Sequence, residues 1–214
     1  MKTLLITGPI GSGKSLASRM LVACGLPVYD CDAQAKDLYR RHPALIEQLE
    51  KALGQSLRKA GSKSEIAATD SVLGTTLADS ALDKKKLAAL LFASPEARRT
   101  VNALVHPLVI ADFLQWSQLQ KGPWVGMESA LLLSPEAGAT LDCDAVLYVD
   151  APVETRLARI LQRDACTREQ ALSRIASQAL DPRDARISRV LVNDGDASQF
   201  EQQVKAYYKT LLEK

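Results

Sequence analysis

Paired cysteines and metal-binding histidines are missing from this chain of 214 residues. It has four cysteines and two histidines, with no C-x-x-C pair and no histidine at metal spacing from a cysteine. The pattern argues against a structural zinc site and against a disulfide framework. We expect the cysteines to be reduced and mostly buried, and the isolated histidines to be structural; the cysteines are Cys24, Cys31, Cys143 and Cys166.

Long apolar runs and a strong charge of one sign are also missing. No stretch approaches the roughly 18 apolar residues of a transmembrane helix, and residues 1–6 are too few for a signal peptide. The net charge is only +2, with 24% charged and 47% hydrophobic residues. We therefore expect a cytoplasmic globular protein with no membrane partner and no nucleic-acid partner.

A phosphate-binding pattern, G-x-x-x-x-G-K-S, occupies residues 8–15. An apolar run precedes it and a helical stretch follows, which is the context this loop requires. Lys14 is expected to reach the β- and γ-phosphates of ATP, and Ser15 to bind Mg²⁺. Pro9 has no N–H to donate. The alternative is an ordinary glycine-rich turn that binds nothing. The predicted ATP-binding residues of this segment are Gly8, Gly11, Ser12, Gly13, Lys14, Ser15 and Leu16.

Strand-like apolar runs alternate with long segments of helical periodicity, which predicts an α/β fold with a five-stranded parallel sheet. The runs are residues 3–7, 27–30, 124–127, 145–149 and 190–192. The gap after the second run is far longer than one crossover helix needs. We expect a nucleotide-binding core of residues 1–32, 123–155 and 188–214, an inserted helical substrate domain of residues 33–122, and a lid of residues 156–187.

Local signals predict where several helices begin and end. Asp83 and Ser94 are expected N-caps, the latter followed by proline. Pro107 is expected to kink or interrupt the helix that Ser94 begins. Thr167 opens a capping-box pattern for a helix expected to end near Asp181.

Carboxylates follow the second and third predicted strands. Asp32 is the candidate that orients an acceptor hydroxyl and accepts its proton, although it could merely cap the helix at residues 33–40. Asp30 is a second candidate near a metal. Glu128, at the end of the third strand, can hold Mg²⁺ directly or through water, or be an ordinary edge residue.

Basic residues between 156 and 189 are all arginine, with no lysine. Most suit a solvated helix face. Arg163 and Arg159 are the candidates to neutralise a phosphoryl group when a lid closes, with Arg174 behind them. The segment contains Arg156, Arg159, Arg163, Arg168, Arg174, Arg183, Arg186 and Arg189.

The ordered set of motifs resembles the dephospho-coenzyme A kinase family over nearly the whole chain. It comprises the loop at residues 7–15, Asp30-Cys31-Asp32-Ala33, residues 82–87, Val105-His106-Pro107-Leu108, Arg163-Asp164, Arg174-Ile175 and Asn193-Asp194-Gly195. The resemblance implies a P-loop kinase that uses ATP to phosphorylate the ribose 3′-hydroxyl of dephospho-CoA, the last step of coenzyme A synthesis. Its departures are Pro9, where relatives commonly have glycine, and the loss of a second acid after Glu128.

Carried over by position, the resemblance implies catalytic roles for Asp32, Lys14 and Arg163. Asn193 and Gly195 fall in the loop that holds adenine, and Lys85 and His106 fall near the acceptor together with Asp32. The partner is thus a small molecule, dephospho-CoA, and we expect a monomer or a weak homo-oligomer. Two alternatives stay open: a nucleoside or nucleoside-monophosphate kinase, and a nucleotide-binding regulatory module.

Overall fold

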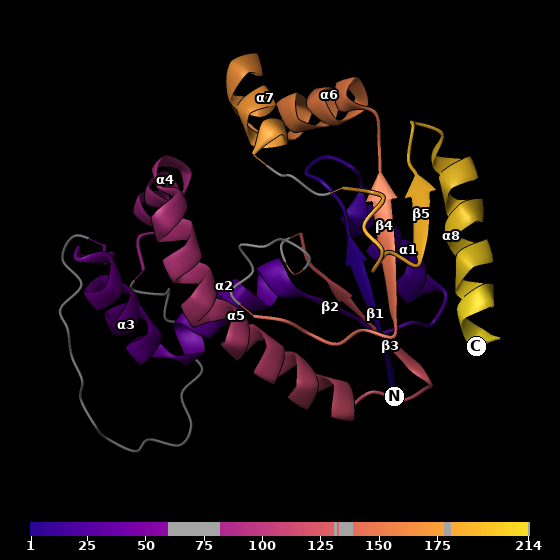
Figure 1. Ribbon diagram of the computed structural model, residues 1–214, viewed down its shortest axis with the longest axis horizontal. Coiled ribbons are helices and arrows are strands. Elements are labelled where there is room, and N and C mark those ends of the chain that lie inside the picture. The colour runs from indigo at the N-terminus through magenta and orange to yellow at the C-terminus, as the bar shows by residue number, and fades with distance from the viewer. Residues whose placement is uncertain (60–81, 131, 133–138, 178–180, 214) are drawn as a thin grey trace.

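The computed structural model describes residues 1–59, 82–130, 132, 139–177 and 181–213, and shows a parallel sheet flanked by helices (Figure 1). Each strand lies within one residue of its expected range. The strands are β1 (Lys2–Thr7), β2 (Val28–Asp30), β3 (Trp124–Glu128), β4 (Ala145–Asp150) and β5 (Arg189–Val192). The helices are α1 (Lys14–Ala23), α2 (Cys31–Arg41), α3 (Pro43–Leu53), α4 (Lys84–Ala93), α5 (Pro95–Gln118), α6 (Val153–Arg163), α7 (Arg168–Ala176) and α8 (Ala197–Leu212).

The sheet has five strands in the order β2-β3-β1-β4-β5, and every pairing between them is parallel. The expected α/β class and parallel sheet are confirmed. Strand β3 lies between β1 and β2, so the strand before Asp32 is not a direct neighbour of the strand before the phosphate loop. Glu128 is in register with both Ile6 and Asp30, so the carboxyl ends of the three strands still share one edge.

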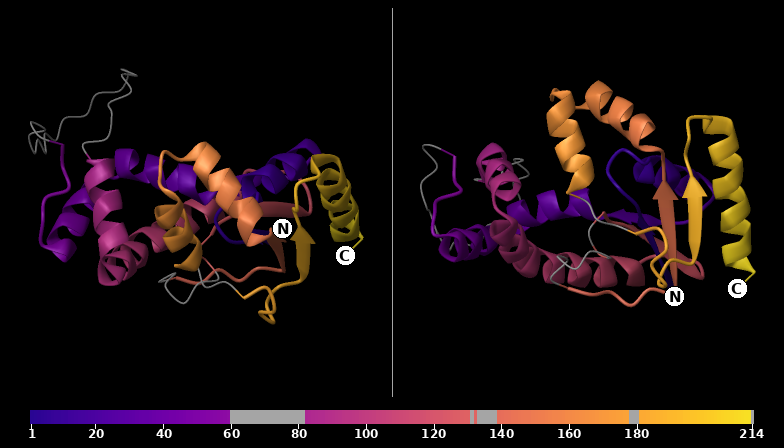
Figure 2. Two further views of the ribbon diagram at one scale, coloured as in Figure 1. Left: turned by 90° about the horizontal axis from the view of Figure 1, so that it is seen from above. Right: turned by 45° about the horizontal axis from the view of Figure 1, so that its top comes forward.

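Alternate side chains of β1 enter different hydrophobic layers, as a strand buried on both faces requires. Leu4 and Ile6 pack with α1 and α8, whereas Leu5 packs with the layer that includes α5. Figure 2 shows α8 at one end of the molecule and α3 and α4 at the other. The sheet is thus the middle of three layers, and both flanking layers fix the direction of β1 and of the loop that follows it.

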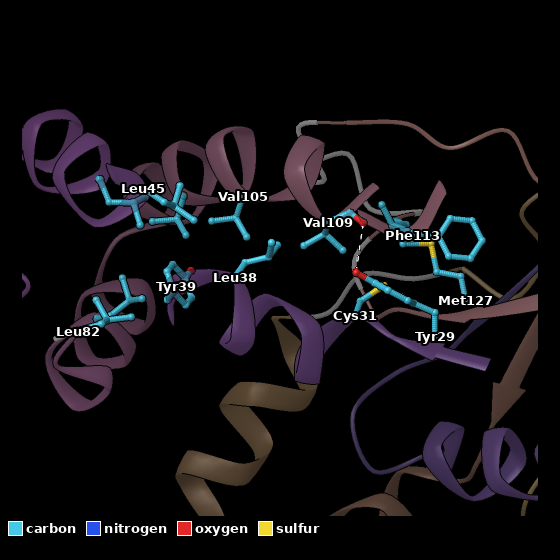
Figure 3. Close-up of a cluster of buried hydrophobic side chains, with 14 of the residues drawn as sticks. Tyr29, Cys31, Leu38, Tyr39, Leu45, Leu82, Val105, Val109, Phe113 and Met127 are labelled. Carbon is cyan, nitrogen blue, oxygen red and sulfur yellow. Dashed lines mark hydrogen bonds between the residues drawn. The ribbon is translucent and has the colours of Figure 1, made fainter. Parts of the chain in front are cut away.

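The helices α2–α5, here called the helical insertion, lie between β2 and β3 in the chain. A continuous apolar cluster joins them to the sheet (Figure 3). Tyr29 of β2 donates a hydrogen bond to Oδ2 of Asp112 at 2.5 Å, and its ring packs on Phe113 at a centroid distance of 5.5 Å. Nη1 of Arg41 contacts Oδ1 of Asp112 at 2.7 Å. The strand before Asp32 is therefore tied directly to α5.

The predicted helix starts are confirmed, whereas one expected helix end is wrong. Asp83, Ser94 and Thr167 accept backbone hydrogen bonds as N-caps, the last in a complete capping box. Pro107 lies inside α5 without interrupting it, since the helix runs from residue 95 to residue 118, and a kink at the proline stays a prediction. The helix after Thr167 ends at Ala176 rather than near Asp181.

The continuity of α5 through Pro107 has a packing explanation. A proline inside a helix costs about 3 kcal/mol, whereas burial of one large apolar side chain contributes about 1.5–3 kcal/mol. Side chains spaced four residues apart on α5 are buried on both sides of the proline: Val101, Val105, Val109 and Phe113. Their burial offsets the lost hydrogen bond.

The hairpin of α6 and α7 follows β4 and stands beyond the carboxyl ends of the strands (Figure 1). Leu157, Ile160 and Ala171 form a small core of its own, and Ile10 of the phosphate loop packs against that core. No helix in the described ranges is long and apolar enough to cross a membrane.

Candidate active site

The loop between β1 and α1 needs glycine at defined points. A Cβ on Gly8 would lie 2.1 Å from the carbonyl oxygen of Val149, and one on Gly13 would lie 2.1 Å from Nδ2 of Asn193. Gly13 also has a φ of +102°, which L side chains rarely adopt. The loop backbone is therefore pressed against β4 on one side and against the residue after β5 on the other.

Helix α1 begins without a side chain that could compete for its first N–H groups. Its N-cap is Gly13, and its first turn holds no acidic residue. Unpaired N–H groups and the helix dipole make such an end favourable for an anion. Lys14 and Ser15 occupy the first turn, where the sequence pattern requires them.

The charges of two carboxylates act on Lys14, from Glu128 at the end of β3 and from Asp32 in the first turn of α2. Its Nζ donates to the carbonyl oxygen of Pro9 at 3.2 Å. Burial lowers the pKa of Lys14, and the negative charges of Glu128 and Asp32 partly offset that effect. The negative charges of both residues therefore act on the ammonium group, although β3 separates the strand before Asp32 from the strand before the loop.

Ser15 and Glu128 form a pair of oxygen ligands at the sheet edge. Oγ of Ser15 donates to Oε1 of Glu128 at 2.7 Å, and Glu128 is buried. A hydroxyl and a carboxylate are hard donors that suit Mg²⁺ when substrate phosphates complete its shell. In the described ranges no three acidic, cysteine or histidine side chains gather as a metal cage.

Asp30 caps helix α2, whereas Asp32 lines a cavity, so the expectation for the cap of this helix changes. Oδ1 of Asp30 accepts from the backbone N–H of Ala33 at 3.0 Å, so Asp30 is the N-cap of α2. The alternative that Asp32 is the cap is wrong. Asp32 lies in the first turn of α2, exposed, at the mouth of a cavity of about 210 Å³. His106 of α5 lines the same cavity, together with Tyr39 and Ser129.

A second cavity of about 270 Å³ lies against the phosphate loop. It brings together most of the basic and polar residues that the sequence assigned to ATP. Arg159 reaches the carbonyl oxygens of Gly11 and Ser12, and donates to Oδ1 of Asn193 at 3.0 Å. Nδ2 of Asn193 donates in turn to the carbonyl oxygen of Ser12 at 2.9 Å. The lining residues include Gly11, Gly13, Lys14, Ser15, Leu16, Arg159, Arg163 and Asn193.

Arg163 is at the end of α6, where it lines this second cavity with an exposed guanidinium. Its Nε contacts Oδ1 of Asp164 at 2.8 Å, and Nη1 of Arg174 contacts Oδ2 of the same carboxylate at 2.9 Å. The arginines at the hairpin junction are thus held by one acid, whose pKa the hydrogen bond from Arg163 keeps below its usual range.

Three residues stand apart from the expected pattern. Lys85 is exposed at the start of α4 and is not a lining residue of either cavity. Gly195 lies in an exposed turn with a φ of +131°, and a Cβ there would meet no atom within 4 Å. Arg19 lines the second cavity and was missed; its spacing of four residues from Ser15 places both on one face of α1.

A parallel sheet, a phosphate loop leading into a helix, and a carboxylate bonded to the loop serine define the class of P-loop phosphotransferases. The comparisons narrow this class. A model of the family described as dephospho-CoA kinase matches residues 3–199. The chain belongs to the dephospho-CoA kinase family.

Relatives with this name cover most of the chain. The dephospho-CoA kinase of Bacteroides fragilis strain YCH46 is 35% identical over 89% of this chain and 84% of its own length. The crystal structure of TT1252 from Thermus thermophilus is similar with a TM-score of 0.70 and 29% identity, over 98% of this chain and 97% of that one. The dephospho-CoA kinase from Campylobacter jejuni shares the fold, with a TM-score of 0.62 and 22% identity over 100% and 98% of the two chains.

Proposed function

We propose that this kinase transfers the γ-phosphoryl group of ATP to the ribose 3′-hydroxyl of dephospho-CoA, which yields coenzyme A and ADP. Membership of the family supports this reaction. The observation that carries it on this chain is that Asp32 lines a cavity separate from the one at the phosphate loop, while its charge still acts on the Lys14 ammonium group. A regulatory module that only hydrolyses ATP would not require the Asp32 carboxylate beside a separate open cavity.

The donor side is the cavity against the phosphate loop. Backbone N–H groups at the start of α1 and the Lys14 ammonium bind the β- and γ-phosphates. Arg159 and Asn193 hold the loop carbonyls, so that its N–H groups face the anion before ATP arrives. Ser15 and Glu128 would hold Mg²⁺, which neutralises phosphate charge when bound. Leu16 and the turn at Gly195 complete the proposed nucleotide site.

The acceptor side is the cavity shared by Asp32 and His106. The Asp32 carboxylate accepts the proton of the 3′-hydroxyl as that oxygen bonds to the γ-phosphorus. The bond from phosphorus to the β,γ-bridging oxygen breaks, and ADP leaves with that electron pair. His106 orients the acceptor in this proposal. Lys85 stays a predicted substrate contact that would require movement of α4 or an extended acceptor.

The proposal also assigns a separate role to each segment of the chain. Residues 1–32, 123–155 and 188–214 bind the nucleotide, residues 33–122 receive the pantetheine-bearing acceptor, and residues 156–187 close over the phosphates. Arg163, exposed and paired with Asp164 at the hairpin junction, reaches the transferred group when that lid closes. The four cysteines are free thiols, which suits a reducing compartment such as the cytoplasm, and we propose a monomer or weak homo-oligomer there.

The test is a comparison of acceptors at equal concentration. The purified chain is incubated with Mg-ATP and either dephospho-CoA, a nucleoside or a nucleoside monophosphate, and ADP and the phosphorylated product are measured. We expect ADP and CoA to form together only with dephospho-CoA. Faster turnover of a nucleoside acceptor would replace the proposal by the nucleoside-kinase alternative. ATP hydrolysis that ignores every acceptor and responds to a protein would favour the regulatory module.

A further inference from the structure

The cavity beside Asp32 lies between helices α2 and α5. On α2 it is lined by Asp32, Ala35 and Tyr39, and these spacings of three, four and seven residues place all three on one face of the helix. Buried residues of α5, spaced four apart, line the other side: Val101, Val105 and Val109. One cavity thus reaches from Asp32 to Tyr39, about 10 Å farther along the axis of α2.

The walls of this cavity are largely apolar and carry no fixed positive charge. Val101, Val105 and Val109 are each 4% exposed, and no lysine or arginine in the described part of the chain lines the cavity. A phosphate group that entered would lose its hydration without gaining a cation, which is costly. The diphosphate of the acceptor is therefore excluded from the interior.

Tyr39 adds a polar group to these apolar walls. The residue is 9% exposed, and its Oη has no hydrogen-bond partner among the residues that the structure describes. Burial raises the pKa of the phenol to about 12, so the hydroxyl keeps its proton at neutral pH and can both donate and accept a hydrogen bond. A hydroxyl that is buried without a partner is unfavourable, which makes this one available to a ligand.

Tyr207 of α8 shows what distinguishes Tyr39. The Oη of Tyr207 also lacks a partner in the described chain, but it is fully enclosed, and burial likewise raises its pKa to about 12. The Oη of Tyr39 is not enclosed in this way, and its residue lines the cavity. The hydroxyl of Tyr39 is therefore open to a molecule in the cavity, whereas that of Tyr207 is not.

Adenine is the part of the acceptor that matches this shape and chemistry. It is attached to the same ribose as the reacting hydroxyl, so it lies close to Asp32 when that hydroxyl does. Its faces are apolar, and its edge bears nitrogens that form hydrogen bonds. The pantetheine arm is joined to the ribose only through the diphosphate. A cavity of about 210 Å³ is also smaller than the roughly 300–1,000 Å³ of sites that enclose a whole drug-sized ligand.

We propose that the cavity between α2 and α5 holds the adenine of dephospho-CoA, with the Tyr39 hydroxyl bonded to a nitrogen on the edge of that base. This inference rests on the proposed kinase function. It fixes the direction of the acceptor: the base is enclosed, the 3′-hydroxyl lies at Asp32, and the diphosphate and pantetheine lie outside the cavity. Tyr39 is thus a residue that contributes to specificity for an adenine-bearing acceptor.

Tyr39→Phe tests the hydrogen bond, because it removes the hydroxyl and keeps the ring. We expect the KM for dephospho-CoA to rise about 2- to 10-fold, the scale of one neutral hydrogen bond, with the KM for ATP unchanged. The Tm without ligand should not fall, because no hydrogen bond of the described chain is lost. Tyr207→Phe is the matched control, since it removes an equally unpartnered hydroxyl away from the cavity, and it should change neither KM.

Ala35→Leu tests the place of the base, because it fills the middle of the cavity at a partly exposed position with a good helix former. Calorimetry is done with the donor site saturated by Mg-ADP. AMP serves as the adenine-bearing half of the acceptor and 4′-phosphopantetheine as the other half. We expect the Kd for AMP to rise at least about tenfold, since the base loses its apolar contacts, and the Kd for 4′-phosphopantetheine to be unchanged. Ala33→Leu, exposed on the same helix and outside the cavity, is the control.

Three results would overturn the assignment. If AMP does not bind the ADP-saturated original protein, or binds Ala35→Leu equally well, the base lies elsewhere. If Ala35→Leu weakens 4′-phosphopantetheine instead, the cavity holds the arm. If Tyr39→Phe leaves the KM for dephospho-CoA unchanged, its hydroxyl does not contact the base, whatever its Tm. Should the original protein make no CoA, the proposed function fails, yet the AMP titrations still test the adenine site.

Discussion

Replacing Asn193 by alanine should loosen the phosphate loop without removing any group that reacts. The Asn193 side chain is buried and joins three segments: its Nδ2 donates to the carbonyl oxygen of Ser12, and its Oδ1 accepts from Arg159. Gly13 packs directly against it. Loss of the amide therefore removes the support between the loop, α6 and the end of β5.

The magnitude follows from the two hydrogen bonds. The bond to Ser12 is neutral and contributes about 0.5–1.5 kcal/mol, and the bond from Arg159 involves a charge and contributes about 1.5–3 kcal/mol. Nη1 of Arg159 also donates to the Ser12 carbonyl oxygen at 3.3 Å. In the variant this remaining bond keeps part of the stabilisation. We expect the free energy of unfolding to fall by about 2–3 kcal/mol, which for a chain of this length lowers Tm by about 4–12 °C.

The assay pairs thermal unfolding with calorimetric titration of ADP. The affinity of Asn193→Ala for ADP should be at least about tenfold lower than that of the original protein. The variant loop must become ordered when ADP binds, and this ordering reduces the net free energy of binding. Gln202→Ala, at an exposed position of α8, is the control and should match the original protein. An unaltered Tm together with unaltered ADP affinity in Asn193→Ala would refute the idea that this amide pre-organises the loop.

Three further predictions concern single side chains. Asp32→Asn should lower kcat about 10²-fold or more while ADP binding, measured by titration, is kept; near-normal turnover would exclude a proton-accepting role. Asp112→Asn should lower the free energy of unfolding by about 1–3 kcal/mol at pH 7. Hydrogen bonding from Arg41 holds the pKa of Asp112 below its ordinary value, so this difference should be present above about pH 4 and vanish as the pH falls further; a pH-independent difference in urea melts would contradict it. Burial and the charges of Asp32 and Asp30 raise the pKa of the Cys31 thiol, so mass spectrometry should show Cys31 unmodified by iodoacetamide at pH 8 in the folded protein and modified in urea.

Local sequence patterns were sufficient to predict much of the fold and of the proposed ATP site. Apolar runs located each strand to within one residue, because a strand buried on both faces must be nearly continuous in hydrophobic residues. The caps at Asp83, Ser94 and Thr167 were readable because a cap is a contact between residues three positions apart. The loop pattern placed Lys14 and Ser15 at the start of α1 for the same reason.

Contacts between segments that are far apart in the chain could not be predicted from the sequence. An apolar run does not record its partner, so the sequence could not show that β3 separates β1 from β2. The bond between Asn193 and Ser12 joins residues 181 positions apart. The sequence also could not show that Asp30 rather than Asp32 caps α2, because aspartate is a good N-cap at either position. The choice depends on the residue at which the extended backbone of β2 ends.

The order of the strands has a consequence for how the chain folds. Strand β1 pairs on one side with β3 and on the other with β4, whose residues begin more than 120 positions later. At about 5–20 residues per second, ribosomal synthesis leaves β1 without a sheet neighbour for roughly 6–24 seconds. Such non-local pairing slows folding and exposes the strand to aggregation. The segment that carries the phosphate loop is thus synthesised first, yet its sheet can form only after the whole helical insertion has been made.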